Sequence, residues 1–382
     1  MKVSLELEPC LKNKSGIGIY TYELSKCLQK YSDITLYGHI FNFINRNNID
    51  KDIEGLNFNK NIFRLFPYGV YRRVWNYVPI RYNFLFNDKS DIYHFFNFIV
   101  PPRIKGKIIT TIHDMTYELY PETMDIRNLK RIKNDIQYSV NRADKIITVS
   151  ESSKKDIIRF LNIEESKIEV IYNGVEYNKF NKSYSEEEKN RVRYRYGLPQ
   201  NYILYMGTLE PRKNIESIIE AFSLLKKENA PNSKNIKLVI AGKKGWLFER
   251  ILNLVDKLNL KDDVIFTDYI DENDKSIIYN MASLFVFPSL YEGFGIPVLE
   301  AMASSVPVIT SNVSSLPEVA GDAAILVEAK DIKSIAKYMG KVLVDKELRN
   351  NLIKNGHEQA KKFTWESSAE KLITIYRDLY NK

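Results

Sequence analysis

The chain has 382 residues, of which 44% are hydrophobic and 27% charged, so it is long enough for two domains, and its composition excludes a disordered or fibrous protein. Its net charge of +8 suits an anionic ligand, an anionic membrane surface or nucleic acid without choosing among them. Two cysteines exclude a disulfide framework, and no apolar run reaches the length of a membrane-spanning helix. Because the first strand alternates apolar with acidic residues and does not resemble a signal peptide, a reduced, cytoplasmic protein is expected.

The first part of the chain alternates predicted strands with predicted helices. Strands are expected at 3–7, 91–96, 107–112 and 145–149. Helices are expected after the first glycine pair, between the last two of these strands, and after Ser150, which is a predicted N-cap. This alternation predicts a parallel sheet covered by helices.

The alternation lapses in the polar segment 176–200, which predicts a linker, and then resumes. Strands are expected at 202–206, 236–242, 263–270, 283–289, 307–310 and 323–327. Helices are expected at 214–226, 246–259, 271–281 and 296–303, with two more near the end of the chain. Two successive arrays predict two doubly wound α/β domains, whose ligands would bind at the carboxyl ends of the strands in a shared cleft.

The strongest functional signal is the segment 289–310, SLYEGFGIPVLEAMASSVPVIT. Gly293 and Gly295 permit unusual backbone angles and a close approach of ligand. The backbone amides of Phe294 and Gly295, next to the N-terminus of the predicted helix 296–303, form a predicted anion site.

Two carboxylates flank this predicted anion site. Glu292 precedes the helix and Glu300 lies inside it, a spacing that predicts one acid beside a transferred sugar and the other beside a ribose. A glycosidase also uses two acids, but it has no use for an anion site between them and is ranked lower. The alternative is that Glu300 is a solvated helix residue and the glycines only form turns.

A second signal lies in the segment 202–222, YILYMGTLEPRKNIESIIEAF. Arg212 and Lys213 precede a helix that Asn214 is predicted to cap. Because the N-terminus of a helix is positive, two cations there are unfavourable unless an anion such as a diphosphate neutralises them. The alternative is a solvated charged loop.

Two weaker signals follow strands in the first part of the chain. Gly16 and Gly18, in GIGIYTYEL, would let the backbone approach a sugar or phosphate, but the segment lacks the third glycine and the acid of a dinucleotide-binding motif. His113 and Asp114 follow the strand 107–112, where site residues are usual. A plain turn and a locally bonded histidine are the alternatives.

Taken in order, these segments resemble the family-4 retaining glycosyltransferases, which have the GT-B fold of two Rossmann-like domains facing across a cleft. EGFGIPVLE is similar to the E-x7-E element of the family, GTLEPRKN to its phosphate loop, GIGIYTYEL to its glycine loop and TIHD to its histidine segment. The resemblance implies that Arg212 and Lys213 hold a nucleotide diphosphate above Gly18. It implies that Glu292 and the backbone amides of Phe294 and Gly295 contact the donor sugar and the phosphates. It also implies that Glu300 contacts the ribose and that His113 contacts the donor sugar.

The same resemblance implies domains at 1–180 with a C-terminal helix 364–382, and at 195–363. It implies hexosyl transfer with retention, without metal or other cofactor, in which the leaving phosphate takes the acceptor proton. The mannosyltransferase-like branch is the best match, which favours GDP-mannose over a UDP-sugar. The expected acceptor is a glycan or lipid-linked glycan.

The acceptor side carries a basic, aromatic stretch. Residues 61–87 contain four arginines, nine aromatic residues and no acid, which suits an anionic membrane surface; the alternative is core aromatics with a solvated basic rim. A nucleic-acid-binding protein is disfavoured because the basic residues are scattered and no such motif occurs. Another GT-B enzyme, a phosphorylase or an epimerase, stays as the remaining alternative.

Overall fold

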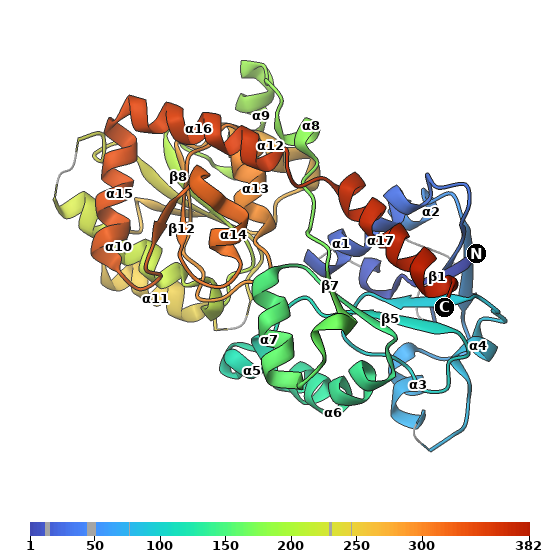
Figure 1. Cartoon of the computed structure of the whole chain (residues 1–382). Helices are drawn as coiled ribbons and strands as arrows, with labels where there is room; N and C mark the ends of the chain where they lie inside the picture. The colour runs from blue at the N-terminus through green and yellow to red at the C-terminus, as the bar shows by residue number, and fades with distance from the viewer. Residues whose placement is uncertain (12–15, 44–50, 76, 229–230, 246) are drawn as a thin grey trace. The chain divides into compact units, whose positions relative to one another are not determined.

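A computed structural model describes residues 1–11, 16–43, 51–75, 77–228, 231–245 and 247–382, which group into two compact units (Figure 1). Unit 1 comprises Met1–Glu118, Ile126–Gly174 and Trp365–Lys382, and unit 2 comprises Leu119–Asp125 and Val175–Thr364. Residues 12–15 of the expected glycine segment and residue 246 of an expected helix lie outside the described residues.

Unit 1 is built on a parallel sheet of seven strands in the order β3-β2-β1-β4-β5-β6-β7. Its core includes Val3 and Leu5 of the interior strand β1 (Lys2–Glu6), which are fully buried because helices cover both faces of the sheet. The strands are β1 (Lys2–Glu6), β2 (Thr35–Phe41), β3 (Asn59–Phe63), β4 (Ile92–Phe95), β5 (Lys107–Thr111), β6 (Lys145–Thr148) and β7 (Ile168–Val170). The helices are α1 (Gly16–Leu28), α2 (Lys51–Glu54), α3 (Tyr68–Val74), α4 (Tyr82–Leu85), α5 (Thr116–Leu119), α6 (Ile126–Arg142), α7 (Glu151–Leu161) and α17 (Trp365–Tyr380).

Unit 2 repeats this plan with six parallel strands in the order β10-β9-β8-β11-β12-β13. The strands are β8 (Tyr202–Met206), β9 (Lys237–Ala241), β10 (Val264–Phe266), β11 (Leu284–Phe287), β12 (Val308–Ser311) and β13 (Ile325–Val327). The helices are α8 (Tyr177–Phe180), α9 (Glu186–Tyr196), α10 (Ile215–Lys227), α11 (Glu249–Lys257), α12 (Glu272–Asn280), α13 (Ile296–Ala303), α14 (Leu316–Ala320), α15 (Ile332–Val344) and α16 (Lys346–Ala360).

The last helix of the chain, α17, packs in unit 1 beside α1 (Figure 1). Its Tyr376 hydroxyl lies 2.7 Å from Nδ1 of His94, a fully buried residue of β4. Trp365 meets the ring of Tyr20 edge-on at 6.0 Å, and Arg377 pairs with Asp33 at 2.8 Å. The C-terminal end of the chain therefore supplies part of the core of its N-terminal unit.

The expected pair of doubly wound α/β domains is confirmed, and most predicted strands lie within two residues of the observed ones. Ser150 caps α7 as expected, since its side chain accepts a hydrogen bond from the backbone N–H of Ser153 at 3.0 Å. The sequence patterns did not reveal β2, β3 and β7, because these strands carry polar or charged residues among the apolar ones.

The expected linker at 176–200 is wrong. The segment contains α8 and α9, and α9 begins with a capping box in which Ser185 and Glu188 bind each other's backbone N–H groups. The polar face of α9 is bonded to unit 2, because Arg191 and Arg195 pair with the buried carboxylate of Asp274 at 3.0 and 2.6 Å. Two of the charges that suggested a solvated linker therefore hold α9 against the rest of unit 2.

Candidate functional site

The order of strands in unit 2 places its candidate residues together. The order reverses between the neighbouring strands β8 and β11, and ligands of doubly wound sheets bind at the carboxyl ends of strands at such a reversal. Arg212 and Lys213 follow β8 in a short 3-10 helix, and Glu292 follows β11. The two connections are joined directly, because the Leu290 N–H donates to the carbonyl of Arg212 at 2.9 Å.

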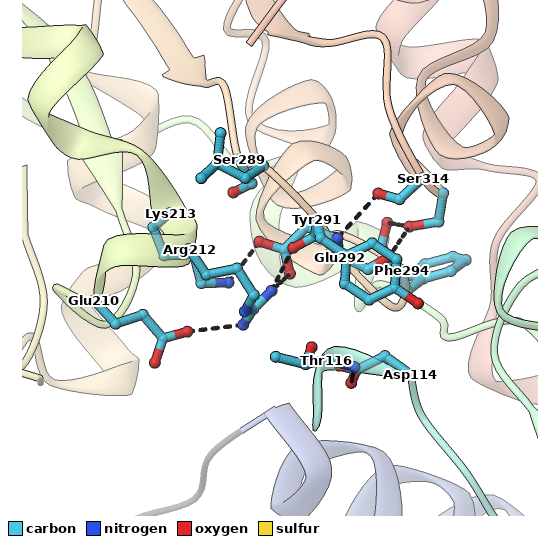
Figure 2. A network of polar contacts seen from close by, with 12 residues as sticks. Asp114, Thr116, Glu210, Arg212, Lys213, Ser289, Tyr291, Glu292, Phe294 and Ser314 are labelled. Carbon is cyan, nitrogen blue, oxygen red and sulfur yellow. Dashed lines mark hydrogen bonds and ion pairs between the residues drawn. The ribbon is translucent and has the colours of Figure 1, made fainter. Parts of the chain in front are cut away.

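Glu292 binds both cations (Figure 2). Its Oε2 lies 3.0 Å from a guanidinium nitrogen of Arg212, and its Oε1 lies 2.6 Å from Nζ of Lys213. The guanidinium also bonds the carboxylate of Glu210 at 2.7 Å and the carbonyl of Tyr291 at 2.5 Å. The two cations, which were expected to need a diphosphate, are thus neutralised by two carboxylates of the chain itself.

The Glu292 carboxyl is buried, with 9% of its side chain exposed. Burial disfavours its charged form, but the charges of Arg212 and Lys213 outweigh this effect and lower its pKa from 4.5 to about 2. The carboxylate is therefore ionised throughout the physiological range. The ion pairs contribute their full stability at pH values above 4.5, where this carboxyl is also ionised in the unfolded chain.

Glu292→Gln is expected to lower the free energy of unfolding by about 3 kcal/mol at pH 7. Because the pKa is lowered on folding, this contribution is lost as the pH falls from 4.5 toward 2. Urea denaturation of both proteins across this range measures the difference. A difference in free energy that stays constant down to pH 2 would contradict the assignment of the low pKa to Glu292.

The backbone that follows Glu292 is held by two serines of the connection after β12. The Ser315 hydroxyl lies between the carbonyl oxygens of Glu292 and Phe294, 2.9 and 2.8 Å away, and its one proton is shared between them. The Glu292 N–H donates to Ser314 Oγ at 2.9 Å (Figure 2). Gly295 then begins α13 with φ at 110°. The positive φ favours glycine here, whereas a Cβ would meet only the end of the Leu316 side chain, with Cδ2 at 2.8 Å.

Gly293 does not share this conformation, because the positive-φ glycines of the described residues include Gly295 and not Gly293. The expectation of unusual backbone angles is therefore wrong for Gly293 and right for Gly295. The backbone of Phe294 and Gly295 leads directly into the first turn of α13. This is the arrangement in which helix N–H groups are available to an anion.

Glu300 lies in α13 with 4% exposure, which excludes the solvated alternative. Its Oε1 lies 2.6 Å from Nζ of Lys275, and its Oε2 accepts a hydrogen bond from the Tyr279 hydroxyl at 3.0 Å. Burial opposes the charge on Lys275, but the carboxylate of Glu300 raises its pKa overall. Both partners come from α12, and neither was singled out by any sequence pattern.

Asn214 does not cap α10 as expected. Its backbone has φ at 56°, and its side-chain amide donates to the carbonyls of Pro288 and Ala329 at 2.9 and 2.5 Å. Its Oδ1 accepts a hydrogen bond from Ser217 at 2.7 Å. The side chain therefore joins the connection after β8 to the end of β11, which fixes the backbone beside Arg212 and Lys213.

The remaining candidates belong to unit 1. Gly16 and Gly18 lie in the first turn of α1, and neither has a positive φ, so helical geometry replaces the expected loop at these two positions. Gly16 is exposed and Gly18 is buried. Both lie on the connection that leaves the carboxyl end of β1.

His113 follows β5 and is buried. Its Nε2 lies 2.8 Å from the carbonyl of Phe96, which only accepts hydrogen bonds, so Nε2 carries the proton and Nδ1 is an acceptor. Burial lowers the pKa of the imidazole, and the Phe96 carbonyl and Asp114 offset this only in part. The neutral ring can accept a hydrogen bond from a hydroxyl at Nδ1.

The described residues contain no group of three or more His, Cys, Asp or Glu side chains suited to a metal ion. Every helix among them is too short or too polar to cross a bilayer.

Comparison with known families finds two matches that together cover most of the chain. Residues 14–179 match the model described as Glycosyltransferase Family 4, and residues 186–359 match the model described as Glycosyl transferases group 1.

Individual relatives and solved structures agree with these matches. The chain is 31% identical to O-antigen chain mannosyltransferase B of Escherichia coli over 388 residues, covering 99% of this chain and all of the relative. It is 32% identical to a serotype-specific mannosyltransferase of the same organism over 273 residues, which is 71% of this chain but 33% of that protein. Sucrose-phosphate synthase from Thermosynechococcus elongatus has the same fold, with a TM-score of 0.76, 19% identity and coverage of 100% and 99%.

Proposed function

Because the chain belongs to glycosyltransferase family 4, we propose that it transfers mannose from GDP-mannose to a hydroxyl of a glycan or lipid-linked glycan, with retention at the anomeric carbon. The choice of sugar is supported by the mannosyltransferase named among its relatives, which aligns over its full length. The observation that carries the proposal is the cluster of Arg212, Lys213 and Glu292 at the reversal of strand order in unit 2.

In the proposed reaction, the bond between the anomeric carbon and the phosphate oxygen breaks, and a bond to the acceptor oxygen forms on the same face. The acceptor proton passes to the departing phosphate. Negative charge grows on the diphosphate as the bond to the anomeric carbon breaks, and Arg212 and Lys213 with the N-terminus of α13 provide fixed positive groups for it. We propose no metal or other cofactor, since these groups supply the charge that a cation would supply.

The carboxylates have separate proposed roles. Glu292 would position the donor sugar beside the two cations, and Glu300 would accept hydrogen bonds from ribose hydroxyls while it stays bonded to Lys275. His113 of unit 1 would accept a hydrogen bond from a hydroxyl of the donor sugar at Nδ1, because its Nε2 proton is held by Phe96.

Guanine nucleotides are expected to stabilise the protein more than uracil nucleotides do. Thermal shift and calorimetry with GDP, GDP-mannose, UDP and UDP-glucose measure this, and a ligand at about a hundred times its Kd adds about 2.7 kcal/mol to the free energy of unfolding. The configuration of the product is read by NMR. Stabilisation by UDP-glucose alone would show that the donor is a UDP-sugar and not GDP-mannose. The absence of any nucleotide effect would contradict the proposed function.

We also propose that the protein associates with an anionic membrane surface through residues 64–84. Of the nine aromatic residues in the stretch 61–87, five are buried core: Phe63, Tyr71, Trp75, Tyr82 and Phe86. The stretch nonetheless exposes Leu65, Tyr77 and Phe84 by 76%, 86% and 85%. Exposed arginines alternate with these apolar residues at 64, 73 and 81, the mixture that binds the interface of an anionic bilayer.

Leu65→Ser/Tyr77→Ser is expected to reduce co-sedimentation with vesicles that contain phosphatidylglycerol. The reason is that two apolar side chains no longer enter the interface. Tyr194→Ser/Val344→Ser is the matched control, because it removes two exposed apolar residues from unit 2. Equal recovery of the wild type with neutral and anionic vesicles would contradict membrane association and leave the transferase proposal untouched.

A further inference from the structure

Unit 1 has a pocket that no candidate transferase residue lines. It has a volume of about 820 Å³ and lies where β4 and β5 begin, between Ser90, Asp91, Lys105 and Gly106. Because all strands of the sheet are parallel, the pocket lies at the amino ends of the strands, and the connection that carries His113 leaves from their carboxyl ends. The volume is in the range of small-molecule sites.

Four basic side chains line this pocket: Arg81, Lys89, Lys105 and Lys107. Lys107 lies 3.7 Å from Asp144. Within the part of the chain that the structure describes, no acidic side chain forms an ion pair with any of the other three. These three side chains are therefore available to bind an anion, and the flexible lysine side chains allow their ammonium groups to reach it together.

The two acids of the pocket wall are already bonded to the protein. Asp88 accepts hydrogen bonds from Ser4 and Ser90 and lies 3.0 Å from Nε2 of His39. Burial disfavours its charge, but these partners lower the pKa of Asp88 to about 2. Asp91 accepts the backbone N–H of Lys2 at 2.7 Å. Both carboxylates stay negatively charged, but their oxygens are bonded to groups of the pocket wall, and the pocket has more basic side chains than acidic ones.

The shape of the pocket also depends on one glycine. Gly106 has φ at 129°, and a Cβ there would lie 2.8 Å from the Tyr93 ring and 3.0 Å from the carbonyl of Asp91. The chain can therefore pass between the amino ends of β4 and β5 only with glycine at this position. At the rim, Phe84 is 85% exposed and Tyr380 of α17 is 53% exposed, so apolar surface adjoins the basic opening.

We infer that this pocket binds the phosphate group of a phosphate ester whose remaining part contacts Phe84 and Tyr380. A phosphate carries close to two negative charges at neutral pH, which matches three basic groups without acidic partners. An apolar or sugar portion fits the aromatic rim and the volume that phosphate alone leaves empty. The ester is either the headgroup of a lipid or a soluble metabolite, and both present the same phosphate chemistry to the pocket.

The test compares Lys89→Gln/Lys105→Gln, which leaves Arg81 and the proposed membrane surface unchanged, with a control, Lys155→Gln/Lys354→Gln, which removes the same charges from exposed positions elsewhere. The soluble arm uses glycerol 3-phosphate, with calorimetry and hydrogen exchange of residues 81–91 and 103–107 as readouts. The vesicle arm uses phosphatidylcholine with and without phosphatidic acid. Excess GDP is present throughout, so that the donor site of unit 2 is not the one observed.

The pocket variant is expected to bind about tenfold or more weakly than the control, because it lacks two charge-assisted contacts. A loss in the soluble arm with no vesicle effect assigns a soluble ester, and a loss confined to vesicles with phosphatidic acid assigns a lipid. Equal behaviour of the two variants in both arms overturns the inference. Glycosyl transfer to a soluble acceptor is expected to be equal in both variants, so failure of the proposed function is read separately.

Discussion

Replacing Arg212 and Lys213 together with glutamine is expected to lower kcat/KM for glycosyl transfer by about 10³-fold, since each charged hydrogen bond contributes about 1.5–3 kcal/mol. Both side chains are 13% exposed and bind the same carboxylate, so they are already oriented toward one point. Both kcat and the Kd of GDP are expected to change, because the cations bind the diphosphate before and during its departure. Steady-state kinetics and calorimetry measure the two effects.

The double variant also leaves Glu292 buried without its cations, which typically costs about 3–5 kcal/mol of stability. A triple variant that adds Glu292→Gln removes this isolated charge and is expected to recover stability but not activity. Lys333→Gln/Lys337→Gln, at exposed positions of α15, is the matched control for loss of charge. A stable triple variant that binds GDP as tightly as the wild type would contradict the diphosphate assignment.

Glu292→Gln alone is expected to separate binding from turnover. In the free protein the carboxylate occupies both cations, and a diphosphate must compete with it. Removing its charge is expected to tighten the binding of GDP about tenfold, or 1.4 kcal/mol. Transfer is expected to fall about 10²-fold, because the donor sugar loses a group that positions it beside the cations.

Calorimetry with GDP and turnover at saturating donor test this separation. Glu347→Gln, an exposed acid of α16, controls for the change in net charge. Weaker binding of GDP by Glu292→Gln would show that the carboxylate acts mainly by holding Arg212 and Lys213 in place. Unchanged turnover would remove Glu292 from the reaction.

Local patterns in the sequence were sufficient to predict the fold. The apolar run at 202–206 forms β8, and the helix expected at 296–303 is α13. Both could be predicted because the pattern of a buried strand or helix lies within a few consecutive residues. The prediction of a linker in place of α9 failed because local patterns do not show contacts between residues far apart in the sequence. Its polar sequence resembles a linker, and the partner of its arginines, Asp274, lies about eighty positions later in the chain.

The candidate site was predictable as a set of residues but not as a set of contacts. The spacing of Glu292 and Glu300 within one segment drew attention to both. The pairing of Glu292 with Arg212 depends on β8 lying next to β11, which only the order of strands determines. The partner residues Glu210, Lys275 and Ser315 do not belong to a recognisable spacing or motif, so they could not be predicted from the sequence.

Placing α17 in unit 1 has a consequence for folding during synthesis. Residues Val175–Thr364, which form nearly all of unit 2, are synthesised before Trp365–Lys382. Unit 1 lacks the partner of His94 and the ring that packs on Tyr20 until translation ends. The half that is made first is therefore completed last, and a stop codon before position 365 would leave a folded unit 2 attached to an unfinished N-terminal half.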